Sequence, residues 1–258
     1  MDQPILASAI ALSATTSLSV GTAAVLLRAY APFSVAQQFS VLFQQFPGRF
    51  AAGIARALPS EPLGSTLCDG RAEDELPHFN QKVKELVDLF TGNSIAASCL
   101  HNGELATCVN HLWLCGMSRE SACFAGQNSL KFAFHGHFAN VARANGKSIS
   151  PADELFDVYR ASFRPTEHIS RPYTAIAYYG CVGHNKKSAQ QKWNGYFQDM
   201  KPENPDFLLG ASEVREWREA VYFQTSVDEL IVRLPTGSEQ CSLESYEMFA
   251  NEAGLGDV

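Results

Sequence analysis

The stretch GELATCVNHLWLCG (residues 103–116) is followed at a short distance by LKFAFHGHF (residues 130–138). The first stretch carries small and thiol-bearing residues before a bulky apolar run that ends in glycine, which favours a helix that enters the core and stops at Gly116. The second alternates apolar and other residues, which predicts a strand that ends near His135. A thiol and a histidine placed in this way form a nucleophile with its base, part of a metal cluster, or a piece of buried core.

Composition limits the classes of protein to consider. The chain has 258 residues, of which 18% are charged and 46% hydrophobic. That is enough apolar material for one large domain, or for one domain with an appendage, and it speaks against a wholly disordered chain. The net charge is -7, and the longest basic run is the pair Lys186 and Lys187. Because phosphate binding depends on clustered Lys and Arg, we predict no nucleic-acid partner.

The cysteines do not form a standard framework. Their number is seven, so at least one is unpaired within the chain, and four of them lie in residues 99–123. This spacing matches neither a small disulfide scaffold nor a CxxC zinc knuckle, so the redox compartment stays open. The seven are Cys68, Cys99, Cys108, Cys115, Cys123, Cys181 and Cys241.

The first 59 residues differ from the rest in charge. No acidic residue lies between Asp2 and Glu61, and residues 5–27 form a run of 23 without any charge. Such a run is long enough to cross about 30 Å of hydrocarbon as one helix, so we expect a continuous membrane-anchoring helix there. Its Ala, Ser and Thr content keeps a buried hairpin or core helix open as the alternative.

The next segment, FSVAQQFSVLFQQF (residues 33–46), spaces its phenylalanines near helical period opposite paired glutamines. This pattern is typical of an amphipathic helix that lies on a membrane or on a partner. We therefore predict an N-terminal membrane-associated helical segment (residues 1–59) and an α/β soluble domain (residues 60–258). The predicted partners of residues 1–58 are a lipid bilayer, membrane protein subunits, or both, on the bacterial periplasmic side or at an organelle membrane. We also expect an oligomer or a complex.

The remaining patterns alternate helices and strands. Residues 74–90 and 150–163 have the apolar spacing and the acidic first turns of helices. Residues 173–183 fit either a strand or an apolar helix, and residues 229–235 fit a last strand. Two more helices are expected at residues 188–200 and 211–223. This interleaving indicates an α/β fold.

The central stretches resemble the Clp protease and crotonase superfold, in particular periplasmic Clp-like proteins. The resemblance is carried by ATC (residues 106–108), LWLCG (residues 112–116), Arg119 and FAFH (residues 132–135), and it extends more faintly to YFQDM and FLLGASEVREWREA. The sequence departs from that family in lacking the Gly-Gly turn that supplies oxyanion-hole amides. Thr107 or Cys108 also stands where that family has serine. The resemblance implies a Clp/crotonase-like soluble domain behind the N-terminal apolar helical segment.

The resemblance also implies a set of catalytic residues. Cys108 would be the nucleophile, activated by the amides and dipole of a helix N-terminus, and His135 would be its general base. Asp157, or alternatively Asp153, would orient the histidine. A second interpretation makes Cys108 and Cys115 core-packing thiols on one face of a helix, because free cysteine is among the most buried residue types.

A third interpretation is a tetrahedral zinc site, because cysteine and histidine are the usual zinc ligands. We predict no cofactor, since GHNKKS (residues 183–188) lacks the glycines of a P-loop. The expected function is that of a membrane-associated Clp-protease-like protein, either a Cys-dependent hydrolase or an inactive homologue, and so enzyme activity stays open. The alternatives are a non-catalytic accessory subunit of a membrane protein complex and a zinc-binding structural domain. The zinc ligands would come from Cys99, His101, Cys108, His111, Cys115, His135 and His137.

Overall fold

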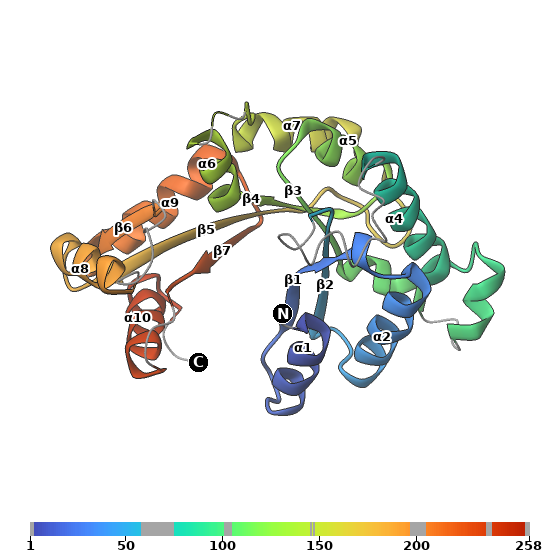
Figure 1. Cartoon of the computed structure of the whole chain (residues 1–258), viewed down its shortest axis with the longest axis horizontal. Coiled ribbons are helices and arrows are strands. Elements are labelled where there is room, and N and C mark those ends of the chain that lie inside the picture. Colours follow the sequence, from blue (N-terminus) through green and yellow to red (C-terminus); the bar gives the residue numbers. More distant parts are fainter. Residues whose placement is uncertain are drawn as a thin grey trace. The chain divides into compact units, whose positions relative to one another are not determined.

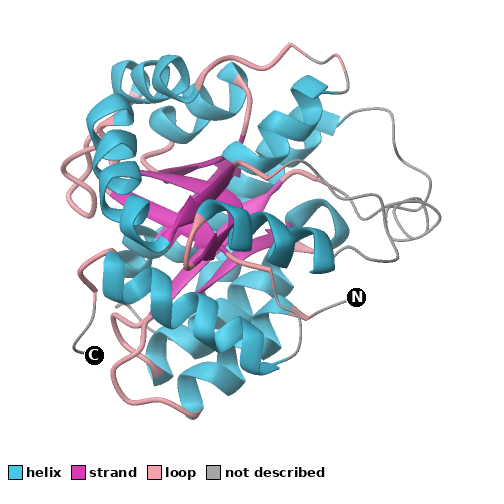
Figure 2. Cartoon of the chain, turned by 90° about the vertical axis from the view of Figure 1, so that its left-hand side faces the viewer, coloured by secondary structure: helices cyan, strands magenta, loops and turns pink. Residues whose placement is uncertain are grey.

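The computed structural model describes residues 3–57, 75–100, 105–144, 146, 148–196, 205–235 and 239–255. The chain divides into two compact units. The first contains Met1–Gly116, Glu120–Phe132 and Val158–Pro172, and the second contains Met117–Arg119, Ala133–Asp157 and Tyr173–Val258. Figure 1 labels the helices and strands along the chain. In each unit, helices pack against parallel strands (Figure 2).

The first unit is built on β1 (Val20–Leu26), β2 (Phe50–Ala55), β3 (Leu112–Gly116) and the first residues of β4 (Lys131–His135), in that order across the sheet. β2 pairs in parallel with both β1 and β3. Parallel strands need crossover connections, and helices provide them here. The helices are α1 (Pro4–Ser13), α2 (Pro32–Gln45), α4 (Glu75–Thr91) and α5 (Arg119–Gln127), with short 3-10 helices η1 (Leu27–Ala29), η2 (Ile95–Leu100) and η3 (Leu105–His111).

The predicted anchor helix over residues 5–27 is wrong. The segment forms α1, a turn and β1, and among the described residues no helix is long and apolar enough to cross a membrane. Arg49 stabilises the turn between α1 and β1, because its guanidinium donates to the carbonyl of Leu18 at 2.9 Å and to Thr15 Oγ1 at 2.8 Å. β1 is the first strand in the sheet order and pairs in parallel with β2. The membrane-associated location inferred from the predicted anchor helix is therefore wrong as well, and the predicted boundary at residues 59 and 60 lies outside the described residues.

The amphipathic helix predicted over residues 33–46 forms as α2, but its apolar face is covered by the protein itself. Phe39 and Phe43 are buried, and their rings lie 5.5 and 5.3 Å from the ring of Phe50 on β2. Phe43 also contacts Phe90 of α4 at 5.9 Å. The phenylalanine spacing therefore marks the side of α2 that packs on its own sheet.

The predicted helix over residues 106–117 is only partly right. Residues 105–111 form η3, but the chain then enters β3, in which Leu112, Trp113, Leu114 and Cys115 are all buried. A parallel strand covered on both faces is apolar at every position, so it lacks the alternation that identifies an ordinary strand. Cys108 and Cys115 therefore do not share a helical face.

The second unit is built on the end of β4 and on β5 (Thr174–Gly183), β6 (Phe207–Gly210) and β7 (Glu229–Arg233). β5 is long enough to pair in parallel with β7 over its first half and with β6 over its second half. The helices are α6 (Gly136–Ala144), α8 (Lys186–Tyr196), α9 (Val214–Thr225) and α10 (Glu239–Glu252), with η4 (Ala211–Glu213); α7 (Ala152–Ser162) contributes to both units. One face of the strands packs against α9 and α10 through Val182, Phe207, Leu209, Val214, Leu234, Phe249, Ala253 and the partly buried Tyr178, Trp217 and Val232.

Two aspartates secure β5 by the same geometry. Asp206, just before β6, donates its backbone N–H to the carbonyl of Tyr179 at 2.7 Å and accepts the Tyr179 N–H on Oδ2 at 2.8 Å. Asp228, just before β7, does the same with Thr174 at 3.0 and 2.8 Å. Each carboxylate thus satisfies a β5 amide one residue before the ladder of the incoming strand begins.

Candidate functional site

The carboxyl ends of parallel strands are the natural place to look for a site. Loops that follow these strands gather at one edge of the sheet, where α/β enzymes place their ligands. In the first unit this edge includes Gly116, which ends β3, and Ser121 in the first turn of α5. In the second unit it includes the ends of β4 and β7.

The turn between β3 and α5 is tight and polar. β3 ends at Gly116 and α5 begins at Arg119, with Ser118 just before the helix and Ser121 in its first turn. A Cβ on Gly116 would lie 2.7 Å from the Cβ of Ser121, so the turn requires glycine at this position. The first amides of a helix and nearby hydroxyls are donors suited to an anionic oxygen group.

The turn between β5 and α8 has a similar sequence layout but is already capped. Asn185 Oδ1 accepts the Ser188 N–H at 2.9 Å, and Ser188 Oγ accepts the Asn185 N–H at 3.1 Å. These side chains occupy the helix N-terminus, as N-cap residues do. The N-terminus of α8 is therefore held by side chains of its own turn.

In the second unit, polar and aromatic side chains gather around Tyr179. The ring of this buried residue contacts the rings of His137 at 5.0 Å and Trp193 at 4.9 Å. The guanidinium of Arg233, the last residue of β7, lies over the same ring at 4.5 Å. Since Asp206 also holds both backbone polar groups of Tyr179, the tyrosine is fixed from several sides.

Asp206 joins three elements at this place. Its Oδ1 accepts the side-chain N–H of Asn140 on α6 at 2.7 Å, and its Oδ2 lies 3.7 Å from Nδ1 of His137 at the start of α6. The side chain of Asp206 is 1% exposed. A buried carboxylate needs such donors, so Asp206 positions α6 and β5 relative to each other.

The structure places the predicted catalytic residues on three different elements. Cys108 lies in η3, half-buried, in the first unit, whereas His135 ends β4 in the second unit. Asp157 lies on α7, also in the second unit. Burial lowers the pKa of His135, so its imidazole is neutral at pH 7. The location of His135 at a strand end is confirmed, and its catalytic role and those of Cys108 and Asp157 stay predictions.

The zinc interpretation has no support in the described part of the chain, which holds no group of three His, Cys, Asp or Glu side chains able to bind a metal. His101 lies outside the described residues. Cys115, one of the expected ligands, is fully buried in β3, and burial raises the pKa of its thiol to about 12. A thiolate is the form that binds zinc, so this sulfur is unsuited to it.

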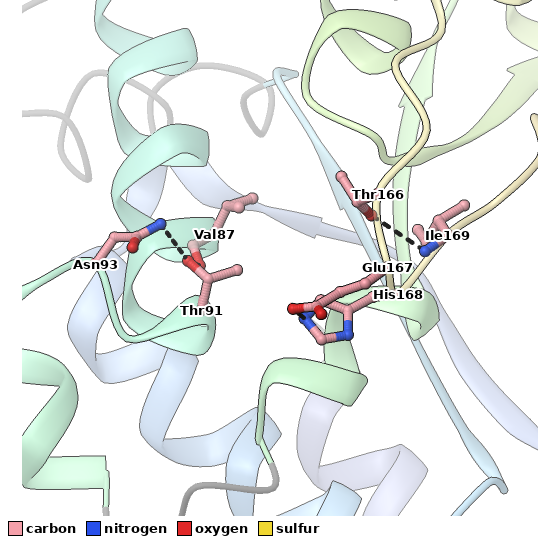
Figure 3. Close-up of polar contacts among 7 residues, drawn as sticks. All are labelled: Val87, Thr91, Asn93, Thr166, Glu167, His168 and Ile169. Carbon is pink, nitrogen blue, oxygen red and sulfur yellow. Dashed lines mark hydrogen bonds and ion pairs between the residues drawn. The ribbon is translucent and has the colours of Figure 1, made fainter.

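Another polar group in the first unit is structural. Figure 3 shows the end of α4, where Asn93 donates to Thr91 Oγ1 at 3.0 Å, and a separate loop in which the Ile169 N–H donates to Thr166 Oγ1 at 3.1 Å. In that loop His168 pairs with the neighbouring Glu167 at 3.3 Å. Each interaction closes within its own segment, as turn and helix-end residues do, so these residues do not form a ligand site.

The sequence analysis missed the residues around Tyr179 and the turn at Ser121. A signal was present: Asp206 and Asp228 each stand directly before a short apolar run, PDFLLG and VDELIV. The Pro-Asp pair of PDFLLG is also typical of an ordinary turn, so it does not by itself identify the strand that follows.

Comparison with known proteins identifies a different family from the one expected. The model of the luciferase-like monooxygenase family matches residues 2–220. A luciferase-like monooxygenase of Escherichia coli K12 is 26% identical over 271 residues, which cover 91% of this chain and 76% of that protein. The uncharacterized protein YceB of Bacillus subtilis is 32% identical over 167 residues, which cover 61% of this chain and 46% of that protein.

Solved structures agree on the fold. Apo-MsnO8 superposes with a TM-score of 0.80 at 20% identity, covering 99% of this chain and 84% of that chain. The oxygenating constituent of 3,6-diketocamphane monooxygenase from Pseudomonas putida, a type II Baeyer–Villiger monooxygenase in complex with FMN, superposes with a TM-score of 0.67 at 15% identity, covering 99% and 84%. These matches show a luciferase-like, TIM-barrel-type arrangement of parallel strands and helices.

The resemblance to Clp proteases and crotonases is therefore wrong, and so are the fold and functions derived from it. A small-residue turn, a glycine, a helix and a strand ending in histidine are features of any β-α-β unit. The Cys-dependent hydrolase, its inactive homologue, the accessory membrane subunit and the zinc-binding domain are replaced by the family that matches residues 2–220. The expected oligomer or complex stays a prediction.

Proposed function

Because the chain belongs to the luciferase-like monooxygenase family, we propose that it is an oxidoreductase that binds reduced flavin mononucleotide and oxygenates an organic substrate with dioxygen. The match of the family model to residues 2–220 is the observation that carries this proposal. A reduced flavin, when bound, supplies the electrons that allow one oxygen atom to enter the product while the other leaves as water.

The residues present fit the phosphate end of such a cofactor. Gly116 allows β3 to turn directly into α5, and the hydroxyl of Ser121 and the amides of α5 from Glu120 onward would hold the phosphate. The dipole of α5 favours negative charge at this end of the helix.

His135 is the predicted site residue that suits this function. It ends β4, and burial keeps its imidazole neutral by lowering its pKa. A neutral imidazole carries one N–H donor and one acceptor nitrogen, so it can orient a polar group of a substrate without adding charge. We propose this positioning role in place of the general base expected from the sequence.

The test compares flavin mononucleotide with riboflavin, which lacks the phosphate, in oxidised and chemically reduced form. Binding is followed by quenching of flavin fluorescence for the oxidised form and by anaerobic absorbance for the reduced form. We expect flavin mononucleotide to bind more tightly than riboflavin. Ser121→Asp should weaken the binding of flavin mononucleotide by at least about tenfold, because a carboxylate repels phosphate, and leave riboflavin unchanged.

Ser188→Asp is the matched control, because it introduces the same charge at the N-terminus of α8. An acidic residue at a helix N-terminus is favourable, so both variants should fold. The control should bind both flavins like the wild type. Absence of saturable binding of either flavin in either redox state would contradict the proposed function. Equal losses of affinity for flavin mononucleotide in the two variants would show that the phosphate does not bind at the turn between β3 and α5.

A further inference from the structure

Arg233 and Tyr179 form a cationic platform on the face of β5 and β7 opposite α9 and α10. The two residues are register partners in the parallel ladder, and the guanidinium lies 4.5 Å from the ring centroid. Tyr178 and Val232, their neighbours along each strand, pack against the α9 and α10 core. Because side chains alternate along a strand, Tyr179 and Arg233 point to the other face.

The platform is fixed before any ligand arrives. Tyr179 is held at its backbone by Asp206 and at its ring by His137 and Trp193. A guanidinium stacked on a fixed aromatic face loses less freedom when it forms hydrogen bonds. Arg233 is itself exposed, so its outer edge can be reached.

The acids near this platform are already engaged. Asp206 accepts hydrogen bonds from Asn140 and from the Tyr179 N–H, and Glu229, on the same face as Arg233, accepts from the Tyr173 hydroxyl at 3.0 Å. Within the ranges described for this chain, no carboxylate forms an ion pair with Arg233. Its planar fork of N–H donors is therefore available for a carboxylate or a phosphate.

An apolar surface adjoins the charge. Ala177 and Ile231 are the next register partners on the same face, and Ile231 is 38% exposed although its side chain is fully apolar. Ala177 is half-buried, and its side chain is a single methyl group. The two residue pairs thus place an apolar floor directly beside a guanidinium.

We propose that Arg233 binds the anionic oxygen group, carboxylate or phosphate, of an organic ligand whose apolar part lies on Ala177 and Ile231. This deepens the proposed function and rests on it for one point only, that the ligand is the substrate or the flavin of the oxidoreductase. The recognition itself follows from the unpaired guanidinium, the fixed tyrosine and the adjoining apolar residues.

The test uses hexanoate, acetate, flavin mononucleotide and riboflavin as probes of the full chain. The backbone amide resonances of Ala177 and Ile231 are followed by NMR during each titration, because these amides remain in every variant. We expect a saturable shift with hexanoate, which should bind more tightly than acetate because its chain covers Ile231. Arg233→Gln should weaken hexanoate binding by about tenfold or more, which is the loss expected for one bidentate charged pair. The affinity of Arg233→Lys for hexanoate should lie between those of Arg233→Gln and the wild type. Arg215→Gln, an equal charge change at an exposed position of α9, is the control and should bind like the wild type.

The flavin titrations identify the source of the anion. A loss of affinity for flavin mononucleotide but not riboflavin in Arg233→Gln assigns the site to the cofactor phosphate. A loss confined to hexanoate assigns it to a carboxylate substrate. Equal effects of Arg233→Gln and Arg215→Gln, or no saturable shift with any anion, would overturn the proposal. If the wild type binds hexanoate at Arg233 but binds no flavin, the proposed function fails while the anion site stands.

Discussion

Replacing Asp206 with alanine should expose the Tyr179 amide to exchange with solvent hydrogen. In the structure this buried N–H donates to Asp206 Oδ2 at 2.8 Å, and the ladder with β6 begins only at the next residue, Gly180. The backbone bond from Asp206 to the Tyr179 carbonyl survives the substitution. The variant therefore removes one charged acceptor from a buried donor and leaves the strand pairing in place.

The size of the effect follows from that single bond. A buried N–H that loses a charged acceptor costs about 2 kcal/mol. If exchange occurs through local opening, this is about a 30-fold increase in the exchange rate of the Tyr179 amide. The bond to Asn140 adds little, because that side chain is exposed. Asp206→Asn keeps a neutral acceptor, and because neutral hydrogen bonds are about half as strong, a rise of about fivefold is expected.

Native-state hydrogen exchange measured by NMR resolves the amides concerned. Asp228→Ala provides the control, because Asp228 holds the Thr174 amide by the same pair of bonds. It should raise the exchange rate at Thr174 and leave Tyr179 protected, whereas Asp206→Ala should do the reverse. The reasoning that each aspartate protects a single β5 amide would be refuted by either of two results. One is a rise in the Tyr179 exchange rate of less than about threefold in Asp206→Ala, and the other is a loss of protection at both amides in both variants.

Three further predictions concern other parts of the chain. Burial raises the pKa of Cys115 to about 12 from 9.0. Iodoacetamide at mildly alkaline pH should therefore modify the exposed Cys99 in the folded protein and Cys115 only in denaturant. Modification of both thiols in the folded protein would be inconsistent with a buried β3. Burial lowers the pKa of His135 from 6.5, so the unfolded chain binds this proton more readily than the folded chain and stability should fall as pH drops below about 6.5. The melting temperature of His135→Gln, measured by calorimetry, should fall less over that pH range than that of the wild type. A Cβ on Gly53 would overlap the carbonyl oxygen of Thr22, so Gly53→Ala should lower the free energy of unfolding by about 3 kcal/mol or more; an unchanged urea midpoint would show that β1 and β2 can separate at no cost.

Several elements could be predicted because their patterns depend on near neighbours in the chain. The helix expected over residues 74–90 forms as α4, where Phe79, Val83 and Leu86 are buried at spacings of three and four. The helix expected over residues 150–163 forms as α7, with its acidic first turn. The strand ending at His135 forms as β4. The helices show their period because only one face is buried, and β4 shows it through the alternation of Phe132 and Phe134 with other residues, although Ala133 between them is buried as well.

Two apolar runs were misassigned because they show no such period. The uncharged run at residues 5–27 and the run LWLCG both lack a visible period, and hydrophobicity alone does not distinguish a membrane helix, a core helix and a central strand. The outcome for the first run depends on Arg49, which lies outside it and fastens the turn after α1. The outcome for the second depends on β2, which pairs with β3 across more than fifty residues of chain.

What the sequence determined by itself was thus the local periodicity of α2, α4, α7 and β4, together with the composition of a folded chain rich in apolar residues. Only the tertiary structure decided where the chemistry lies. Tyr179 and Arg233 meet because β5 and β7 pair in a parallel register, and Asp206 reaches Tyr179 because β6 joins the same strand one residue further on. Parallel pairing brings together residues that are distant in the chain, and no local pattern specifies which strands become neighbours.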